Sequence, residues 1–422
     1  MFVKFDEWTQ GRAISSFGTN AGADELPFQS WRNFKEAYAP ELVQRAVGES
    51  KIAVRRALDP FGGSGTTALA CQFLGVHPTT VEVNPFLADL IEAKLCQYDA
   101  DKLARDLGVI ASMAPKGAQH TSTRLDHLPP TFVEPGINDR WIFDQPVAQR
   151  IAALLEAIEG LSDKKHRRLF RVLLGGILVE VSNVVISGKG RRYRRGWQSR
   201  TRASTCVDDA FFASARAAIG DIHRFASRRE TDYELIRGDA RTAISNAKCD
   251  LALFSPPYPN SFDYTDVYNV ELWVLGYLRS FASNRELRTS TLSSHVQVSR
   301  AFSPPPSGSL LLDQTVRELA NGRSNLWDKR IPEMVGAYFA DLIGIVRQIK
   351  GSLSPGGSLW LVVGDSRYAG IQVATADIIA ELAKAGGWLI HENEPFRSMR
   401  LSPQQGGRAE LKETLIKLEH PG

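Results

Sequence analysis

The sequence predicts an α/β fold with a mostly parallel sheet, interrupted by a mainly helical insertion. Three observations support this fold class. Strand-like and helix-like segments alternate over residues 1–100, as in proteins with parallel sheets. Between 101 and 231 the alternation stops, and three helical patterns follow one another. Strand patterns then return, so we expect 1–100 and 232–422 to form one core, into which 101–231 is inserted.

Each predicted element rests on its local pattern. Proline favours the first turn of a helix, which places a helix start at Pro40. The polar segment 283–330, rich in Ser, Pro and Gly, is expected to be a long loop, and loops of that length are usually functional or disordered. In chain order, the other predicted elements are helix 40–47, a strand ending at 58, helix 68–74, strand 79–83, helix 85–98, helices at 147–158, 169–186 and 208–225, strands 233–236 and 250–254, helices 267–278 and 331–349, strand 358–363, helix 373–385, and strands 388–391 and 414–418.

Composition places the chain among soluble globular proteins. It has 422 residues, of which 43% are hydrophobic and 23% charged, and its net charge is +4. The N-terminus lacks the pattern of a signal peptide, and there is no run of about 20 apolar residues. The four cysteines are scattered, without the spacing of a zinc site. We therefore expect a cytoplasmic protein that binds neither a membrane nor a metal.

The most informative stretch is 59–67, DPFGGSGTT, which joins a predicted strand to a predicted helix. Its glycines allow a tight turn and the close approach of a ligand. Its hydroxyl groups are expected to cap the following helix. Asp59 places a carboxylate at the strand end, where open α/β sheets bind ligands. A phosphate loop would carry Lys where Gly65 stands, so this loop suits a cationic ligand better than a polyphosphate.

A second motif, Ser255-Pro256-Pro257-Tyr258, follows the predicted strand 250–254. The prolines restrict the backbone and remove hydrogen-bond donors, so the Pro256 carbonyl can act as a rigid acceptor. Ser255 offers a second acceptor oxygen, and Tyr258 offers a flat ring face. The alternative is a strand-end turn that is merely stiffened by proline.

Together the two motifs resemble those of the amino-methylating DNA methyltransferases, which use S-adenosylmethionine to methylate cytosine N4 or adenine N6. In that family DPFxGSGTT is the cofactor loop and (D/N/S)PPY is the catalytic loop. The resemblance covers most of the chain outside the insertion. It implies a Rossmann-like class I methyltransferase sheet with S-adenosylmethionine as cofactor. The implied cofactor residues of the loop are Asp59, Phe61, Gly62, Gly63, Ser64, Gly65, Thr66 and Thr67, and the implied catalytic residues are Ser255, Pro256, Pro257 and Tyr258.

The resemblance assigns three more residues to the cofactor. Glu82 lies about 20 residues beyond the glycine loop, where an acid can accept from ribose hydroxyls, or else it is solvated beside a helix cap at Asn84. Asp239 matches the family's acceptor for the adenine amine, or is an ordinary helix cap. Phe34 matches a leading motif that closes over the methionine end, or is plain core. Beyond the catalytic loop, Asp263 is expected either to line the base pocket or to cap a helix.

The insertion contains a basic loop at 188–202, where arginines alternate with Tyr193 and Trp197. Arginine and lysine bind phosphates, and arginine also reads guanine edges. A charge run is ordinarily a solvated loop, but beside these motifs it favours contact with double-stranded DNA. The segment 283–330 is the candidate target-recognition loop. The expected DNA-binding residues are Lys189, Arg191, Arg192, Arg194, Arg195, Arg200 and Arg202.

The resemblance implies direct in-line methyl transfer to the amine of a flipped base, within a restriction–modification or related defence system. Family members with SPPY are mostly cytosine-N4 enzymes, so Ser255 favours cytosine N4, with adenine N6 as the alternative. No cysteine follows a proline, which disfavours covalent methylation of cytosine carbon 5. A non-catalytic cofactor-binding subunit and an RNA amino-methyltransferase also stay open. A cognate restriction endonuclease is a candidate partner, and Glu413-Thr414 matches a terminal motif with a structural role.

Overall fold

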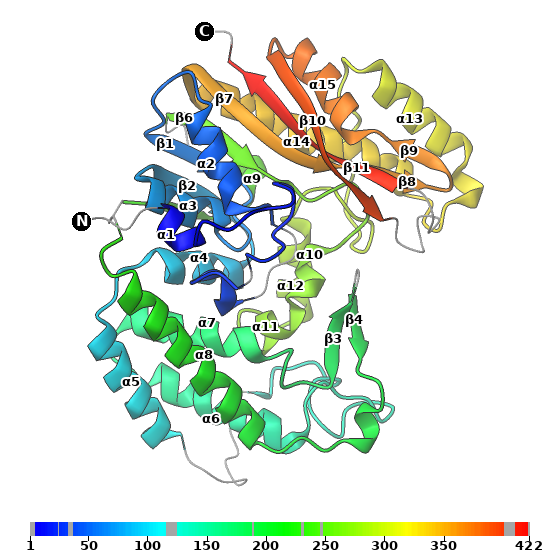
Figure 1. The fold of residues 1–422 in the computed structure, drawn as a ribbon. Coiled ribbons are helices and arrows are strands. Elements are labelled where there is room, and N and C mark those ends of the chain that lie inside the picture. The colour runs from blue at the N-terminus through cyan, green and yellow to red at the C-terminus, as the bar shows by residue number, and fades with distance from the viewer. Residues whose placement is uncertain are drawn as a thin grey trace.

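A computed structural model describes residues 5–23, 25–32, 37–114, 125–187, 190–228, 232–244, 248–400 and 410–420. At its centre is a seven-stranded sheet in the order β10-β11-β7-β6-β1-β2-β5 (Figure 1). The strands from β5 to β7 pair in parallel, and β11 runs antiparallel to both of its neighbours. This confirms the predicted α/β, Rossmann-like class. The strands are β1 (Arg56–Asp59), β2 (His77–Glu82), β5 (Glu234–Arg237), β6 (Cys249–Phe254), β7 (Leu353–Gly364), β10 (Leu389–Arg400) and β11 (Glu410–Glu419).

The order of the strands reverses beside β1, which has β2 on one side and β6 on the other. The chain leaves β1 through α3 (Thr66–Leu74) and leaves β2 through α4 (Pro85–Leu95). Open α/β sheets bind ligands outside the carboxyl ends of their strands at such a reversal. The two sequence motifs follow β1 and β6, so the fold brings both of them to this point.

Helices cover both faces of the sheet, because successive strand residues are apolar on opposite sides. Leu253 and Trp360 belong to one hydrophobic core, which includes α3 and α4. Their chain neighbours Phe254 and Leu361 belong to a second core. The first core also contains α2 (Pro40–Gly48), and the second contains α9 (Ala240–Ala243), α13 (Leu310–Asn321), α14 (Ile331–Ser352) and α15 (Thr375–Ala385).

Among the described residues, the larger buried apolar side chains of the insertion belong to the first core. Gly175 of α7 lies so close to Phe86 of α4 that a Cβ there would stand 2.6 Å from the phenyl ring. Figure 1 shows the insertion gathered below the sheet. Its helices are α5 (Ala100–Met113), α6 (Gln145–Glu159), α7 (Lys164–Ile177) and α8 (Thr205–Arg224).

The predicted helix 169–186 is wrong at its carboxyl end. The helix there, α7, ends at Ile177, and β3 (Val184–Ser187) pairs antiparallel with β4 (Gly190–Tyr193). The β-branched run at 184–186 prefers a pleated strand, where its side chains lose less freedom than in a helix. The basic segment therefore begins as a β-hairpin, which stands beside α10 (Tyr264–Val267).

The predicted long loop 283–330 is also wrong. It contains most of α12 (Phe281–Thr289) and all of α13, which packs against α14 and α15. Leu312 and Leu319 put an apolar stripe of α13 into the second core. Ser280 and Ser309 cap the two helices. The Ser and Pro residues that suggested a loop lie mostly in the link between these helices and at their caps.

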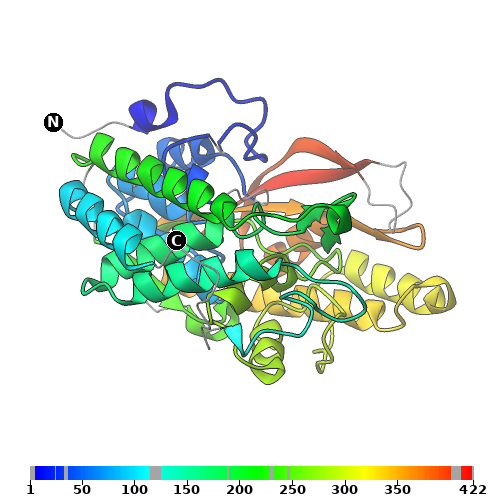
Figure 2. The same cartoon turned by 90° about the horizontal axis from the view of Figure 1, so that it is seen from below.

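Smaller boundary differences follow the local packing. Two short helices, α10 and α11 (Asn269–Val274), replace the predicted helix 267–278. The predicted helix at 373–385 starts later, because β9 (Ile371–Val373) pairs with β8 (Ser366–Tyr368). A short helix near the N-terminus, α1 (Phe5–Thr9), packs Phe5 and Trp8 into the first core. Figure 2 shows the insertion helices on one side of the molecule and α13 and α14, in yellow, on the other.

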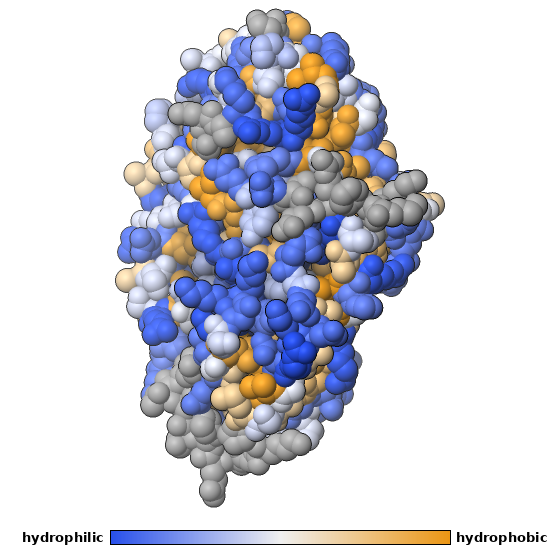
Figure 3. Space-filling model, turned by 90° about the vertical axis from the view of Figure 1, so that its left-hand side faces the viewer, coloured by the Kyte–Doolittle hydropathy of each residue, from blue (hydrophilic) through white to orange (hydrophobic). Residues whose placement is uncertain are grey.

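Among the described residues, no helix is both long enough and apolar enough to cross a membrane. The side of the molecule in Figure 3 is mainly hydrophilic, and its apolar residues form small, separate groups. Such scattered apolar surface is ordinary for a folded protein.

Candidate functional site

A cavity of about 390 Å³ opens at the carboxyl ends of the central strands. It brings together the loop 59–67, Glu82, Asp239 and the motif 255–258, although they are far apart in the sequence. Gly65 is the one described member of the predicted set that does not line this cavity, and Phe34 lies outside the described residues. The cavity therefore joins the predicted cofactor residues to the predicted catalytic loop.

The glycine loop turns as predicted, but its hydroxyls do not cap the next helix. Gly63 has a φ of 53° and Gly65 a φ of 81°, a backbone region in which side chains are strained. Gly65 itself is the N-cap of α3 and makes no side-chain cap bond. Thr67 instead donates from Oγ1 to Asp59 Oδ2 at 2.6 Å. The threonine therefore fixes the rotamer of the acid that opens the loop.

Two buried carboxylates face each other across the loop. Burial raises the pKa of Asp59 to about 6, although hydrogen bonds from Thr67 and Phe61 act in the opposite direction. Burial likewise raises the pKa of Glu82 to about 7, against hydrogen bonds from the backbone of Asn84 and Gly63. No basic side chain neutralises either acid among the described ion pairs. The site is therefore ready for hydrogen-bond donors or a cation.

Glu82 is not solvated, contrary to the alternative reading. It is 8% exposed, and its two oxygens accept from Gly63 N and Asn84 N at 2.7 Å each. Asn84 also caps α4, accepting from Phe86 N at 3.0 Å. Asn84 therefore caps α4 while Glu82 stays buried, and Glu82 links the end of β2 to the glycine loop through its hydrogen bond from Gly63 N.

A buried lysine contacts the glycine loop, and the sequence analysis did not assign it to the site. Lys94 is fully buried, and its Nζ donates to Ser64 O at 2.7 Å and to Gln29 Oε1 at 2.9 Å. Burial lowers the pKa of Lys94 to about 7. The ammonium group thus holds the loop from the side away from the cavity, and it comes from the last turn of α4.

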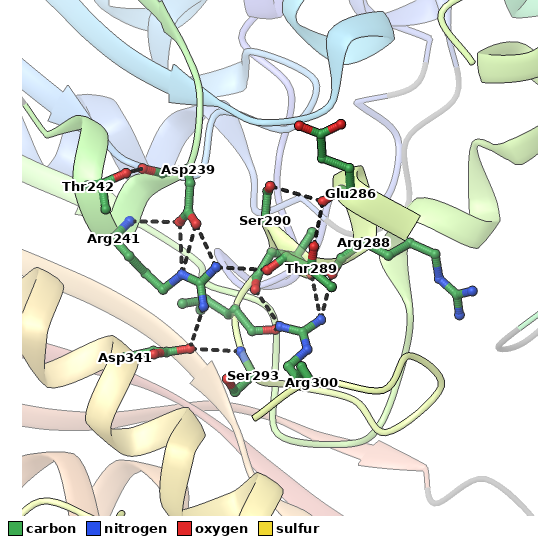
Figure 4. A network of polar contacts seen from close by, with 12 residues as sticks. Asp239, Arg241, Thr242, Glu286, Arg288, Thr289, Ser290, Ser293, Arg300 and Asp341 are labelled. Atoms are coloured by element: carbon green, nitrogen blue, oxygen red, sulfur yellow. Dashed lines mark hydrogen bonds and ion pairs between the residues drawn. The ribbon is translucent and has the colours of Figure 1, made fainter. Parts of the chain in front are cut away.

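Asp239 lines the cavity and also caps α9, so the predicted helix cap and a position at the cofactor site are compatible in this residue. Its carboxylate also accepts from the Arg241 guanidinium, with the shortest contact at 2.6 Å. Figure 4 shows Arg241 reaching on to Asp341 and to the carbonyl of Thr289, at the end of α12. The predicted adenine acceptor is therefore anchored to the segment that follows α12.

The catalytic loop has a directional chain of hydroxyl groups. Ser255 Oγ donates to the Tyr258 hydroxyl at 3.3 Å, and Tyr258 donates to Glu413 Oε1 at 2.8 Å. Burial raises the pKa of Tyr258 well above its usual value, and the Glu413 charge adds to this. With its own hydrogen turned toward Tyr258, the oxygen of Ser255 presents lone pairs to the cavity.

Tyr38 and Glu413 are among the lining residues that sequence reasoning did not assign to the site. Tyr38, in the same stretch as Phe34, lines the cavity and contacts Thr67 Oγ1 at 2.5 Å. Glu413, read as structural, is 2% exposed and also lines the cavity. An aromatic residue just before α2 could have marked Tyr38, whereas nothing local distinguishes Glu413 from other strand residues.

Of the two roles predicted for Asp263, lining the base pocket or capping a helix, the structure shows the helix cap. It caps α10 by accepting from Thr265 N at 3.0 Å, and its other oxygen accepts from Arg288 Nε at 2.5 Å. The side chain is 5% exposed. Asp263 therefore ties the start of α10 to α12 and does not line the cavity.

The basic segment divides into internal and exposed cations. Arg194 donates to Ser182 O at 3.0 Å and to Val179 O at 2.9 Å, so it fastens the hairpin to the end of α7. Arg202 donates to Glu180 O at 3.1 Å. These two guanidinium groups support the fold of the segment.

The other arginines of the segment are more open. Arg192, Arg195 and Arg200 are exposed. Arg191 lies over the Phe132 ring at 5.6 Å, and Lys189 lies outside the described residues. Tyr193 and Trp197 stack on each other with ring centroids 4.8 Å apart. This contact stabilises the segment that carries the exposed arginines.

No group of three or more potential metal ligands was found in the described part of the chain. The cysteines are free, and burial raises the pKa of Cys249 to about 12. Burial raises the pKa of Cys71 as well. Protonated, buried thiols are poor nucleophiles, in agreement with the reading against covalent catalysis.

The chain is similar to two type II methyltransferases over most of its length. It is 24% identical to the type II methyltransferase M.BsoBI of Geobacillus stearothermophilus over 476 aligned residues, covering 98% of this chain and 89% of that protein. It is 25% identical to the type II methyltransferase M.AvaI of Nostoc sp. over 420 residues, covering 90% and 82%. No protein-family model matches. The reading of the motifs as those of a methyltransferase thus agrees with these relatives.

Similarity to solved structures is weaker. The glycopeptide N-methyltransferase MtfA complexed with S-adenosylmethionine aligns with a TM-score of 0.30 and 9% identity, covering 91% of this chain and 87% of that one. A TM-score this low leaves the strand order of the sheet as the basis for the fold class.

Proposed function

We propose that this chain is an S-adenosylmethionine-dependent DNA methyltransferase of a restriction–modification system, which transfers a methyl group directly to the N4 amine of cytosine. The observation that carries this proposal is the single cavity shared by the loop 59–67, Glu82, Asp239 and the motif 255–258. A methyl donor and a methyl acceptor must meet in one space, and the motifs for both line it. The type II methyltransferase relatives support the same reading.

The cofactor is held by the acidic end of the cavity. S-adenosylmethionine carries a sulfonium and an ammonium group, and Asp59 is a buried carboxylate without a basic partner among the described residues. Glu82 accepts from the ribose hydroxyls, and Asp239 from the adenine amine. When bound, the cofactor supplies an electrophilic methyl group.

The catalytic loop orients the amine. The Pro256 carbonyl and the Ser255 oxygen accept the two amine hydrogens, which points the nitrogen lone pair at the methyl group. The chain from Ser255 through Tyr258 to Glu413 keeps the serine hydrogen away from the amine. The ring of Tyr258 stacks on the flipped base, a contact worth about 1–3 kcal/mol.

The DNA is held outside the cavity by the exposed arginines of the hairpin segment. Arg192, Arg195 and Arg200 contact phosphates, and the hairpin stands beside α10, which begins just after the catalytic loop. The segment 283–330, in which Ser290 just after α12 lines the cavity and α13 packs against α14 and α15, is the proposed target-recognition region. A cognate restriction endonuclease is the expected partner.

Nucleoside analysis of methylated DNA tests the proposal. Purified protein, DNA from cells that lack methylation and labelled S-adenosylmethionine should yield N4-methylcytosine and no 5-methylcytosine. N6-methyladenine alone would replace the base and keep the mechanism. Methylation of RNA alone, or of neither nucleic acid, would favour the RNA enzyme or the non-catalytic subunit. As a control, Pro257→Ala should lose product while it keeps cofactor affinity, because that residue belongs to the catalytic loop only.

A further inference from the structure

The segment 290–300, after α12, contributes one wall of the cavity. Five of its residues line the cavity, although none belongs to a predicted motif. The wall is polar but buried: Ser294 and His295 are each 1% exposed. The lining residues are Ser290, Thr291, Leu292, Ser294 and His295.

Hydrogen bonds from Ser261 fix this wall relative to the catalytic loop. Ser261 N donates to Ser294 O at 2.9 Å, and Ser261 Oγ accepts from Val296 N at 3.3 Å. The Gln297 amide donates to Ser261 O at 2.8 Å. Ser261 has a φ of 56°, a strained conformation that such bonds must maintain. His295 therefore keeps a constant position relative to Ser255, six residues before Ser261.

Two arginines fasten the other side of the wall. Arg300 donates to Thr291 O at 2.7 Å and to Arg288 O at 2.6 Å. Asp341 accepts from Ser293 N at 2.9 Å and from Arg241, as Figure 4 shows. The wall is therefore rigid, as a surface that recognises a base must be.

The environment of His295 determines which of its nitrogens carries the hydrogen. Nε2 lies 3.1 Å from Arg300 Nη2, and a guanidinium can only donate, so Nε2 must be the acceptor. Burial lowers the pKa of His295 to about 4, and the Asp263 carboxylate, 3.9 Å from Nε2, offsets this only in part. The ring is therefore neutral near pH 7, with its hydrogen on Nδ1.

Nδ1–H of His295 is a buried donor without a hydrogen-bond acceptor among the described residues. The neighbouring Gln297 donates its amide nitrogen to Ser261 O, and its side chain lies near enough to the ring to raise the pKa of His295 slightly against the effect of burial, but Nδ1 has no hydrogen-bond partner of normal geometry among the described residues. A buried donor left unpaired costs about 1–3 kcal/mol. Such a group in a cavity wall is satisfied when a ligand supplies the acceptor.

We propose that His295 donates from Nδ1 to the ring nitrogen beside the exocyclic amine of the flipped base. This inference rests on the proposed function and names the residue that selects the base class. Cytosine N3 and adenine N1 are acceptors, whereas guanine N1 and thymine N3 carry hydrogens and would meet a second donor. The wall thus admits a base whose ring nitrogen on the Watson–Crick edge is an acceptor, while Ser255 and Pro256 hold the amine itself.

Two matched substitutions separate this role from a structural one. Asn places an amide nitrogen where Nδ1 stands and loses the acceptor for Arg300, so His295→Asn should keep most of the methylation rate. Gln can keep the acceptor for Arg300 and loses the donor in the cavity, so His295→Gln should lower kcat/KM by roughly 10- to 100-fold. Cofactor affinity, measured by calorimetry, should stay unchanged in both. The opposite order, with Asn impaired and Gln active, would overturn the proposal.

A modified substrate tests the same contact from the DNA side. The target base is replaced by 3-deazacytosine, or by 1-deazaadenine if nucleoside analysis identifies adenine. Wild-type protein should lose roughly 10- to 100-fold in kcat/KM, and His295→Gln should show no further loss. Equal rates of the wild type on the natural and modified bases would refute the contact even if both variants failed to fold. Absence of any methylated product from the natural base would instead count against the proposed function.

Discussion

Most of the cofactor end of the cavity comes from one stretch of chain, 59–82, to which Asp239 is added from a distance, whereas the target end is assembled throughout from segments far apart in the chain. At the cofactor end, 59–67 and Glu82 contact each other through backbone groups, such as Gly63 N to Glu82 Oε2 at 2.7 Å. At the target end, Tyr258 depends on Glu413, 155 residues away, and Ser261 depends on the wall at 294–297. A change at the cofactor end should therefore act on binding itself, and a change at the target end should act on catalysis through distant partners.

The largest effect should come from Gly63→Val. At a φ of 53° a β-branched residue is strained by about 1–3 kcal/mol, and its side chain would stand in the cofactor's place. We expect calorimetric titration to detect no binding of S-adenosylmethionine. Gly75→Val is the matched control, because Gly75 has a φ of 74° at the other end of α3, away from the cavity. It should lower the melting temperature and keep the affinity; cofactor binding by a folded Gly63→Val protein would contradict the assignment of the loop.

At the target end, Tyr258→Ala should remove base stacking worth about 1–3 kcal/mol and lower kcat/KM by roughly 10- to 100-fold. Tyr258→Phe keeps the ring but removes the hydroxyl that accepts from Ser255 Oγ and donates to Glu413 Oε1, so it should cause a smaller loss than Tyr258→Ala. Cofactor affinity should not change in either variant. A wild-type methylation rate in Tyr258→Ala would mean that 255–258 is a structural turn and that the comparison between the two ends fails.

The hairpin segment should affect DNA affinity more than chemistry. Changing Arg192, Arg195 and Arg200 to Ala removes three exposed cations. Each lost phosphate contact should lower the slope of log affinity against log salt by about 0.9. Arg194→Ala is the control, since that guanidinium bonds to backbone carbonyls and should reduce thermal stability first. An unchanged salt slope in the triple variant would remove this segment from the DNA interface.

The smallest effect concerns pH. Glu82 has its pKa raised by burial to about 7, and ribose hydroxyls donate more strongly to the ionised carboxylate. Cofactor binding therefore favours the deprotonated form, and the affinity should rise roughly ten-fold between about pH 6 and about pH 8, then level off. Glu82→Gln cannot ionise and should flatten this dependence. If the dependence persists in that variant, another group such as Asp59 or Lys94 is responsible.

Some elements could be predicted because their information is local. The turn at 59–67 needs glycines at positive φ, and Pro40 and Asn84 mark helix starts by rules that involve neighbouring residues alone. The segment 283–330 could not be predicted in this way. Its polar composition suggested a loop, although Leu312 and Leu319 form an apolar stripe. That stripe stabilises a helix because it packs against α14 and α15, which are distant in the sequence.

By itself the sequence determined the α/β class, the order of the two motifs and the groups that the two motif loops bring to the cavity, because strand-end turns are encoded by adjacent residues. Only the tertiary structure decided that Arg194 faces inward, that Lys94 lies under the glycine loop, and that Glu413 and His295 reach the target end. These positions depend on the pairing of β11 with β7 and on hydrogen bonds between remote segments. Contacts between segments so far apart in the chain are decided by how the whole core packs, and the local sequence around each residue does not reveal them.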